Sequence, residues 1–224
     1  MLPARFSNRP PNPNGGVIIF GLQLLLVILV PILDDGRALA PLVYVGVLIA
    51  CLATTVSLLG YGRTAATIAV VGGVAVALVV LAGRLVGPVR LVLWATLISA
   101  GAVTVTLTLK SAFAAGVPAV QRIFCGAAGY VMLGFVFAAI HGLVGFLVDG
   151  GYVIQSGVER MRPIHWSDYV WLSFATLTTS GFGDVVSVGS VPSAVSTLEA
   201  LAGILFPATL IARIASLADA GRRT

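Results

Sequence analysis

The chain has 224 residues, of which 58% are hydrophobic and only 9% are charged, and its formal net charge is +5. A soluble globular domain carries about 25% charged residues, so the composition excludes that class, and it equally excludes a disordered chain. The 13 Lys and Arg residues are scattered between apolar runs instead of forming a cluster, which argues against nucleic-acid binding. The composition therefore indicates an integral membrane protein.

Six apolar runs are each long enough to form a transmembrane helix, which needs about 20 mostly apolar residues. They lie at 17–33, 39–60, 64–86, 89–109, 126–148 and 193–216. Because lipid offers no partners to unpaired backbone groups, we expect each run to be helical, in an all-α membrane protein with six spans. The first run could alternatively belong to a cleaved signal peptide, but it exceeds the usual length of a signal-peptide core.

The basic residues favour an orientation with both termini in the cytoplasm. With the N-terminus inside, eight of the 13 Lys and Arg residues would face the cytoplasm and five would face outward. This asymmetry follows the positive-inside rule. The Ala-, Val- and Gly-rich, lysine-poor composition is typical of a bacterial chain, so we expect the protein in a bacterial inner membrane.

The runs divide the chain into five expected segments. These are a flexible cytoplasmic leader, a four-helix membrane domain, a cytoplasmic linker, a second membrane domain with the last two runs and a short cytoplasmic tail, at 1–16, 17–110, 111–124, 125–217 and 218–224. The fourth span of the four-helix domain lacks the repeated basic residues with which a transmembrane helix senses voltage. The alternative is that Arg84 and Arg90 sense voltage at the membrane edge.

Between the fifth and sixth runs, residues 165–184 are too polar to span a membrane. Ser167 is a suitable N-cap and Asp168 suits the positive end of the helix dipole, which predicts a short helix from there to Thr178. After it, glycines alternate with other residues at 179–183. Glycine permits backbone conformations in which successive carbonyls point to one side, and a ring of such carbonyls can replace the hydration shell of a monovalent cation.

The sequence Thr176-Leu177-Thr178-Thr179-Ser180-Gly181-Phe182-Gly183-Asp184 resembles the signature of tetrameric potassium channels, usually Thr-x-Thr-Thr-Val-Gly-Tyr-Gly-Asp. The resemblance covers 125–217 and implies an outer helix, a re-entrant pore helix, a selectivity-filter loop and an inner helix. It implies that the filter is lined by main-chain oxygens of Thr179, Ser180, Gly181, Phe182 and Gly183, with K⁺ bound at the first four. One chain supplies one filter strand, so a homotetramer is implied.

The same resemblance assigns supporting roles to residues around the filter. Asp184 would lie at the outer mouth, the Trp171 indole N–H would bond to it, and Thr178 would support the filter from the pore helix. Phe182 in place of the usual tyrosine removes a hydroxyl group, and Ser180 in place of valine introduces one. The Ser180 hydroxyl could recruit water, loosen the carbonyl cage and weaken discrimination against sodium.

The sixth run contains one carboxyl group and two residues that can bend a helix. Glu199 lies at membrane depth, where an ionisable group is costly, and we expect it to support the filter by bonding to Ser173 or Thr176. Direct ion binding by Glu199 is the alternative. The resemblance implies that Gly203 and Pro207 form a gating hinge, while the alternative is that both serve packing alone.

The two histidines of the chain have less specific interpretations. His141 lies within the fifth run, where a bond to a neighbouring helix is favoured over a pH-sensing role. His165 is expected to be a solvated loop residue near the outer mouth.

Together these features predict a potassium-selective channel that conducts K⁺ passively and is not an enzyme. No cofactor is expected beyond the permeant K⁺, and the expected partners are copies of the chain and membrane lipids, without nucleic acid. The nearest alternative is a weakly selective monovalent cation channel. Alternatives of another class are a non-conducting assembly subunit and a secondary transporter, for which repeated broken helices or a buried ion pair would be expected.

Overall fold

The computed structural model describes residues 14–33, 87–114, 117–155 and 162–220, together with the single residues 49, 53, 55, 67, 71 and 72. Its contacts divide the chain into two compact units, Met1–Leu133 and Gly134–Thr224. The predicted spans at 39–60 and 64–86 lie almost entirely outside the described residues.

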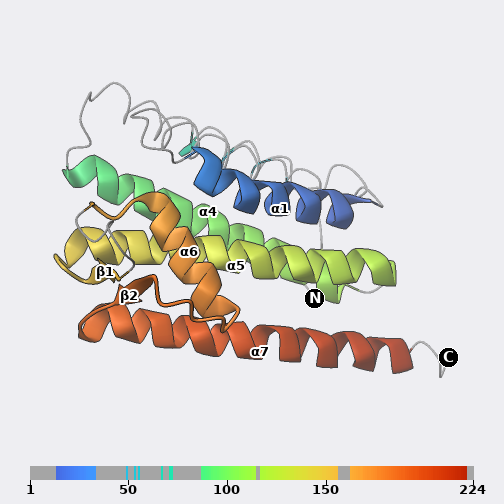
Figure 1. Ribbon diagram of the computed structural model, residues 1–224. Coiled ribbons are helices and arrows are strands. Elements are labelled where there is room, and N and C mark those ends of the chain that lie inside the picture. Colours follow the sequence, from blue (N-terminus) through green and yellow to red (C-terminus); the bar gives the residue numbers. More distant parts are fainter. Residues whose placement is uncertain are drawn as a thin grey trace. The chain divides into compact units, whose positions relative to one another are not determined.

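Three described helices are long and apolar enough to cross a membrane, at Arg90–Phe113, Ala119–Leu147 and Ser190–Ser216. They belong to α4 (Gly87–Phe113), α5 (Ala119–Leu147) and α7 (Ser190–Ala220), shown in Figure 1. The first predicted span forms α1 (Gly15–Leu33). Its described apolar part is shorter than the three candidate membrane spans. The chain is thus mostly helical in its described part, and the count of six spans stays a prediction.

The segment between α4 and α5 is shorter than the predicted cytoplasmic linker at 111–124. Helix α4 continues to Phe113 and α5 begins at Ala119, so both helices extend into that range. The Arg122 side chain closes the connection by donating from Nε and Nη2 to the carbonyl oxygen of Ala114, at 3.1 and 2.6 Å. The polar residues at this point therefore mark the end of the apolar run and not the end of the helix.

The second unit contains the C-terminal part of α5, the short helix α6 (Trp166–Leu177), α7 and two short strands. Strands β1 (Tyr152–Ile154) and β2 (Val185–Ser187) pair antiparallel, with Tyr152 opposite Ser187. This ribbon departs from the all-α expectation. Its strands are rich in Val and Ile and are bordered by glycines with positive φ at 150, 183 and 189, a pattern that favours short strands between turns.

Helix α6 is the short helix predicted between the last two spans, but the predicted N-cap is wrong. The N-cap residue is His165, not Ser167, with extended backbone angles of φ −95° and ψ 171°. The carboxylate of Asp168, three residues on, accepts the backbone N–H of His165 at 2.7 Å. A side chain reaching back from the first turn thus replaces the hydroxyl cap that the sequence suggested.

Candidate functional site

Helix α6 lies against both α5 and α7, and glycines on those helices make the close approach possible (Figure 1). On α5, a Cβ added to Gly134 would come within 2.8 Å of the Phe174 ring, and one added to Gly145 would overlap the Tyr169 hydroxyl. On α7, a Cβ added to Gly203 would collide with the backbone carbonyl of Leu177. These glycines leave room for two aromatic side chains and for the C-terminal end of α6.

Aromatic contacts fix the same helix on the α5 side. The Phe135 and Phe174 rings meet edge to face with centroids 5.4 Å apart, and Tyr152 meets Tyr169 in the same way at 5.3 Å. Such pairs contribute about 0.5–1.5 kcal/mol beyond the area they bury. The direction in which α6 points is therefore determined by packing along its length.

An ion pair fixes the N-terminal end of α6. Both guanidinium Nη atoms of Arg162 donate to the Asp168 carboxylate, at 2.6 and 2.7 Å, while His165 donates its backbone N–H to the same group. The Asp168 side chain is 10% exposed, so these charge-assisted bonds are only partly screened by solvent. His165, predicted to be a solvated loop residue, is half-buried here.

Neutralising this carboxylate should loosen the start of α6. We expect Asp168→Asn to lower stability by about 1–2 kcal/mol, because hydrogen bonds to a charged group are replaced by neutral ones. Thermal unfolding of the purified protein in detergent measures the effect. Asp149→Asn is the matched control, since Asp149 is exposed; equal melting temperatures for the two variants would contradict the anchoring role.

The backbone after α6 turns back onto the end of the helix. The backbone N–H groups of Ser180 and Gly181 both donate to the carbonyl oxygen of Ala175, at 2.9 and 3.1 Å. In a planar trans peptide the carbonyl points opposite to the N–H, and the described residues include no cis peptide. The carbonyls of Thr179 and Ser180, which belong to these two peptides, therefore point away from α6.

Alternate residues of this segment have left-handed backbone angles. The φ angles are +58° at Thr179, +56° at Gly181 and +77° at Gly183. Thr179 adopts this region although it carries a Cβ, which costs about 1–2 kcal/mol. The sequence predicted glycine conformations at alternate positions, and the structure adds a third such position that no glycine marks.

The hydroxyl group of Ser180 has a partner within its own chain. Thr178 Oγ1 donates to the Phe174 carbonyl at 2.6 Å, and Ser180 Oγ lies 2.9 Å from Thr178 Oγ1. Because the single Thr178 hydroxyl proton points to Phe174, Ser180 is the donor in the second bond. The side chain that was expected to recruit water is thus tied to the end of α6.

The aromatic residues beside this segment make a different contact from the predicted one. The Trp171 and Phe182 rings are stacked, with centroids 5.0 Å apart and an interplanar angle of 22°. No hydrogen bond joins the Trp171 indole to the Asp184 carboxylate among the residues that the structure describes within this chain. The parallel ring contact holds the indole plane against Phe182, and both rings are about half exposed in the isolated chain.

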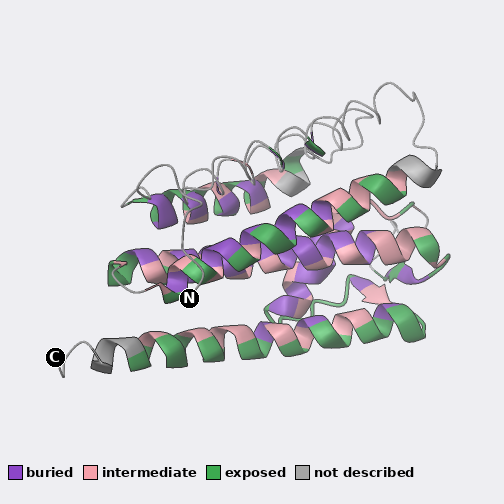
Figure 2. Ribbon diagram, turned by 180° about the vertical axis from the view of Figure 1, so that it is seen from behind, coloured by how far each residue is buried: buried purple, intermediate pink, exposed green. Residues whose placement is uncertain are grey.

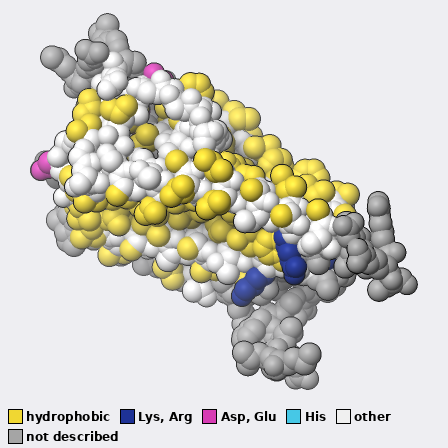
Figure 3. Space-filling view, turned by 90° about the horizontal axis from the view of Figure 1, so that it is seen from below, with side chains coloured by type: hydrophobic (Ala, Val, Ile, Leu, Met, Phe, Trp, Pro, Cys, Tyr) yellow, Lys and Arg dark blue, Asp and Glu magenta, His cyan; other side chains and the backbone are white. Residues whose placement is uncertain are grey.

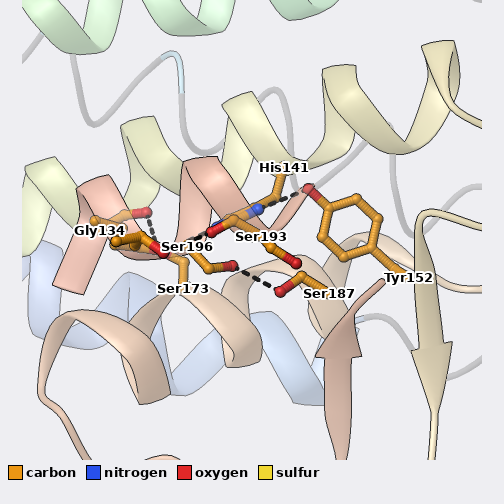
Figure 4. A network of polar contacts seen from close by, with 9 residues as sticks. Gly134, His141, Tyr152, Ser173, Ser187, Ser193 and Ser196 are labelled. Atoms are coloured by element: carbon orange, nitrogen blue, oxygen red, sulfur yellow. Dashed lines mark hydrogen bonds and ion pairs between the residues drawn. The ribbon is translucent and has the colours of Figure 1, made fainter. Parts of the chain in front are cut away.

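Glu199 lies in a buried polar network between α6, α5 and α7, and Figure 4 labels His141, Ser173 and Tyr152 of this network. Glu199 is 0% exposed and contacts Ser173 Oγ through one carboxyl oxygen and His141 Nε2 through the other, at 2.5 and 2.8 Å. Of the two partners predicted for Glu199, the structure shows the bond to Ser173. His141 bonds to a neighbouring helix, as its favoured interpretation held, and also contacts the Tyr152 hydroxyl.

Gly203 and Pro207 lie in a continuous helix. Gly203 packs on Leu177 of α6, so its lack of a side chain is required by packing. Pro207 has no N–H and therefore leaves the carbonyl of Gly203, four residues earlier, without its helical donor. The two residues that were assigned to a hinge, Gly203 and Pro207, are therefore the pair between which one helical hydrogen bond is missing.

The side of α7 that faces away from α6 is largely apolar and exposed, as Figures 2 and 3 show. Its large exposed side chains are Val191, Leu198, Leu201, Ile204, Leu205 and Ile211. A helix with so many exposed apolar residues is suited to contact lipid or further protein.

A comparison with known families identifies this region. Residues 135–219 match the family model described as an ion channel, which defines the class as a membrane transport protein and not an enzyme. The match supports the resemblance to the potassium channel superfamily for this part of the chain. No curated protein and no solved structure matches the chain significantly.

Several contributors to the site were not anticipated from the sequence. No sequence pattern assigned a role to Tyr152 or Arg162, or marked Gly134 and Gly145 as contacts of α6. A spacing signal exists only for α5, where Gly134, His141 and Gly145 are separated by seven and four residues and so share one helix face.

Proposed function

We propose that residues 135–219 form one quarter of a potassium-selective pore, in which α6 is the pore helix and 179–183 is the filter. The observation that carries the proposal is the direction of the filter backbone. Two consecutive N–H groups point at Ala175, so the carbonyls of Thr179 and Ser180 point away from α6. Four such segments around one axis would surround a K⁺ ion with main-chain oxygens.

The exposure of the filter residues supports a homotetramer. All residues from Thr178 to Asp184 are exposed in a single chain, and the apolar face of α7 is exposed as well. The oxygen atoms of one chain can contact a cation from one side only, whereas a closed cyclic assembly surrounds the ion. The orientation of α6 supports the same arrangement, because a helix C-terminus carries a partial negative charge that favours a cation.

Selectivity for potassium over sodium is supported by the position of the Ser180 hydroxyl. Its proton is donated to Thr178 at the end of α6, so the hydroxyl group cannot donate that proton to a water molecule behind the carbonyls. A weakly selective cation channel remains the second candidate, because Ser180 is an exposed polar residue where the family signature has valine.

Reversal potentials of the purified protein in planar bilayers, with potassium opposite sodium, test these candidates. We expect reversal close to the potassium equilibrium potential for the wild-type protein and for Ser180→Val, because the hydroxyl is already bonded within the chain. Robust current that reverses near zero in the wild type but not in Ser180→Val would establish the weakly selective channel. Absence of current at every voltage and pH would favour the assembly-subunit alternative.

A further inference from the structure

Four buried side chains from four different elements form one continuous polar chain. His141 on α5, Ser173 on α6 and Glu199 on α7 are each 0% exposed, and Tyr152 on β1 is 5% exposed. Figure 4 shows the bonds at the two ends, from Tyr152 to His141 and from Ser173 to the carbonyl of Gly134. Glu199 joins these two halves through its two carboxyl oxygens.

The donor of each hydrogen bond in this network can be assigned by starting from the Gly134 carbonyl at one end. The Gly134 carbonyl only accepts, so Ser173 donates its single hydroxyl proton there, at 2.7 Å. The proton between Ser173 and Glu199 must then come from the carboxyl group. The second carboxyl oxygen of Glu199 accepts from His141 Nε2–H, which leaves His141 Nδ1 to accept the Tyr152 hydroxyl proton, with 2.8 Å between the heavy atoms of each bond.

In this assignment each hydrogen bond contains one proton, and the side chains of Tyr152, His141, Glu199 and Ser173 are all neutral. Burial raises the pKa of the Tyr152 hydroxyl, which keeps that group a donor. With an ionised Glu199 and a charged His141, Ser173 would face two acceptors with one proton, and both His141 nitrogens would be donors. The Tyr152 hydroxyl proton would then have no acceptor among the described residues, and two charges would lie in a low-dielectric interior.

We propose that Glu199 is protonated and acts as a positioning residue of the filter, at the centre of a one-directional hydrogen-bond chain from Tyr152 to Gly134. A neutral pair is not the buried ion pair expected of a transporter. The role in the filter rests on the function proposed above, whereas the protonated state rests only on the hydrogen-bond geometry.

The hydrogen-bond network contacts the segments on both sides of the filter. Ser173 lies on α6 one turn before Leu177, where the segment leading into the filter begins. Tyr152 pairs with Ser187 on β2, the strand that follows Asp184 directly. A further bond joins Ser187 to Ser196 of α7, at 3.1 Å. The carboxyl group of Glu199 thus links the helix before the filter to the strand after it.

Infrared difference spectra of the protein in lipid at neutral pH test the protonated state without requiring conduction. We expect Glu199→Gln to remove a carbonyl band of a protonated carboxylic acid, while Asp149→Asn, at an exposed carboxylate, removes only carboxylate bands. Loss of carboxylate bands from Glu199→Gln would overturn the proposal.

Substitution tests the positioning role. Glutamine can reproduce a protonated carboxyl group, since its amide donates to Ser173 and its carbonyl accepts from His141. We therefore expect Glu199→Gln to keep the wild-type melting temperature and reversal potential. Glu199→Ala should lower the melting temperature and shift the reversal potential toward zero. A wild-type reversal potential in Glu199→Ala would overturn the positioning role, and a wild type without current would instead count against the proposed function.

Discussion

Replacement of Gly181 by alanine is expected to abolish potassium current while the protein still folds and assembles. Gly181 has a φ of +56°, and a Cβ added there meets no atom within 4 Å, so the substitution creates no clash within the chain. Its cost is backbone strain of about 1–2 kcal/mol, repeated in each copy of the chain. Rotation of the neighbouring peptides relieves that strain and turns carbonyl oxygens away from the ion path.

Gly150→Ala is a matched control for this experiment. Gly150 has a comparable φ of +69° and open space around it, but it lies in the turn after α5 and outside the proposed filter. Macroscopic current in bilayers or liposome flux, normalised to the amount of assembled protein, compares the two variants. Wild-type current from Gly181→Ala would show that these carbonyls do not form the conduction path, and an equal loss from Gly150→Ala would assign the effect to folding.

The sequence predicts the helices of the channel domain well because lipid imposes a strong apolar signal. The run at 193–216 is extended at both ends in α7 (Ser190–Ala220), and the run at 126–148 begins earlier in α5. Polarity marks where a helix leaves the apolar layer, whereas the helix itself continues as long as its backbone bonds do. Span positions can therefore be read from composition more accurately than helix ends.

The contacts around α6 were less predictable because they depend on the rotation of one helix against another. The cost of a buried carboxyl group pointed to a partner for Glu199, and Ser173 was one of two candidates on the helix that faces it. Tyr152 carried no such signal, since its role requires β1 to fold back beside His141. The pattern of apolar and polar residues along one sequence contains no information on where a strand such as β1 folds back against a helix.

Substitution of Gly203 by alanine is expected to destabilise the channel domain, although alanine is the better helix former. In an unobstructed helix position the exchange stabilises by about 0.5–1 kcal/mol. At Gly203 the new Cβ would collide with the backbone carbonyl of Leu177, which no side-chain rotation can move. Overpacking of this kind costs about 1–3 kcal/mol per chain, and it would push α7 away from the end of α6.

Gly21→Ala supplies the control, because Gly21 lies in α1 and a Cβ added there meets nothing within 4 Å. Melting temperature and reversal potential together separate packing from hinge motion. Packing predicts that Gly203→Ala melts lower than Gly21→Ala and loses potassium selectivity, since the C-terminal end of α6 leads directly into the proposed filter. A hinge without a packing role predicts an unchanged melting temperature and reversal potential, with only the open probability altered. The direct backbone contact at Leu177 favours the first result.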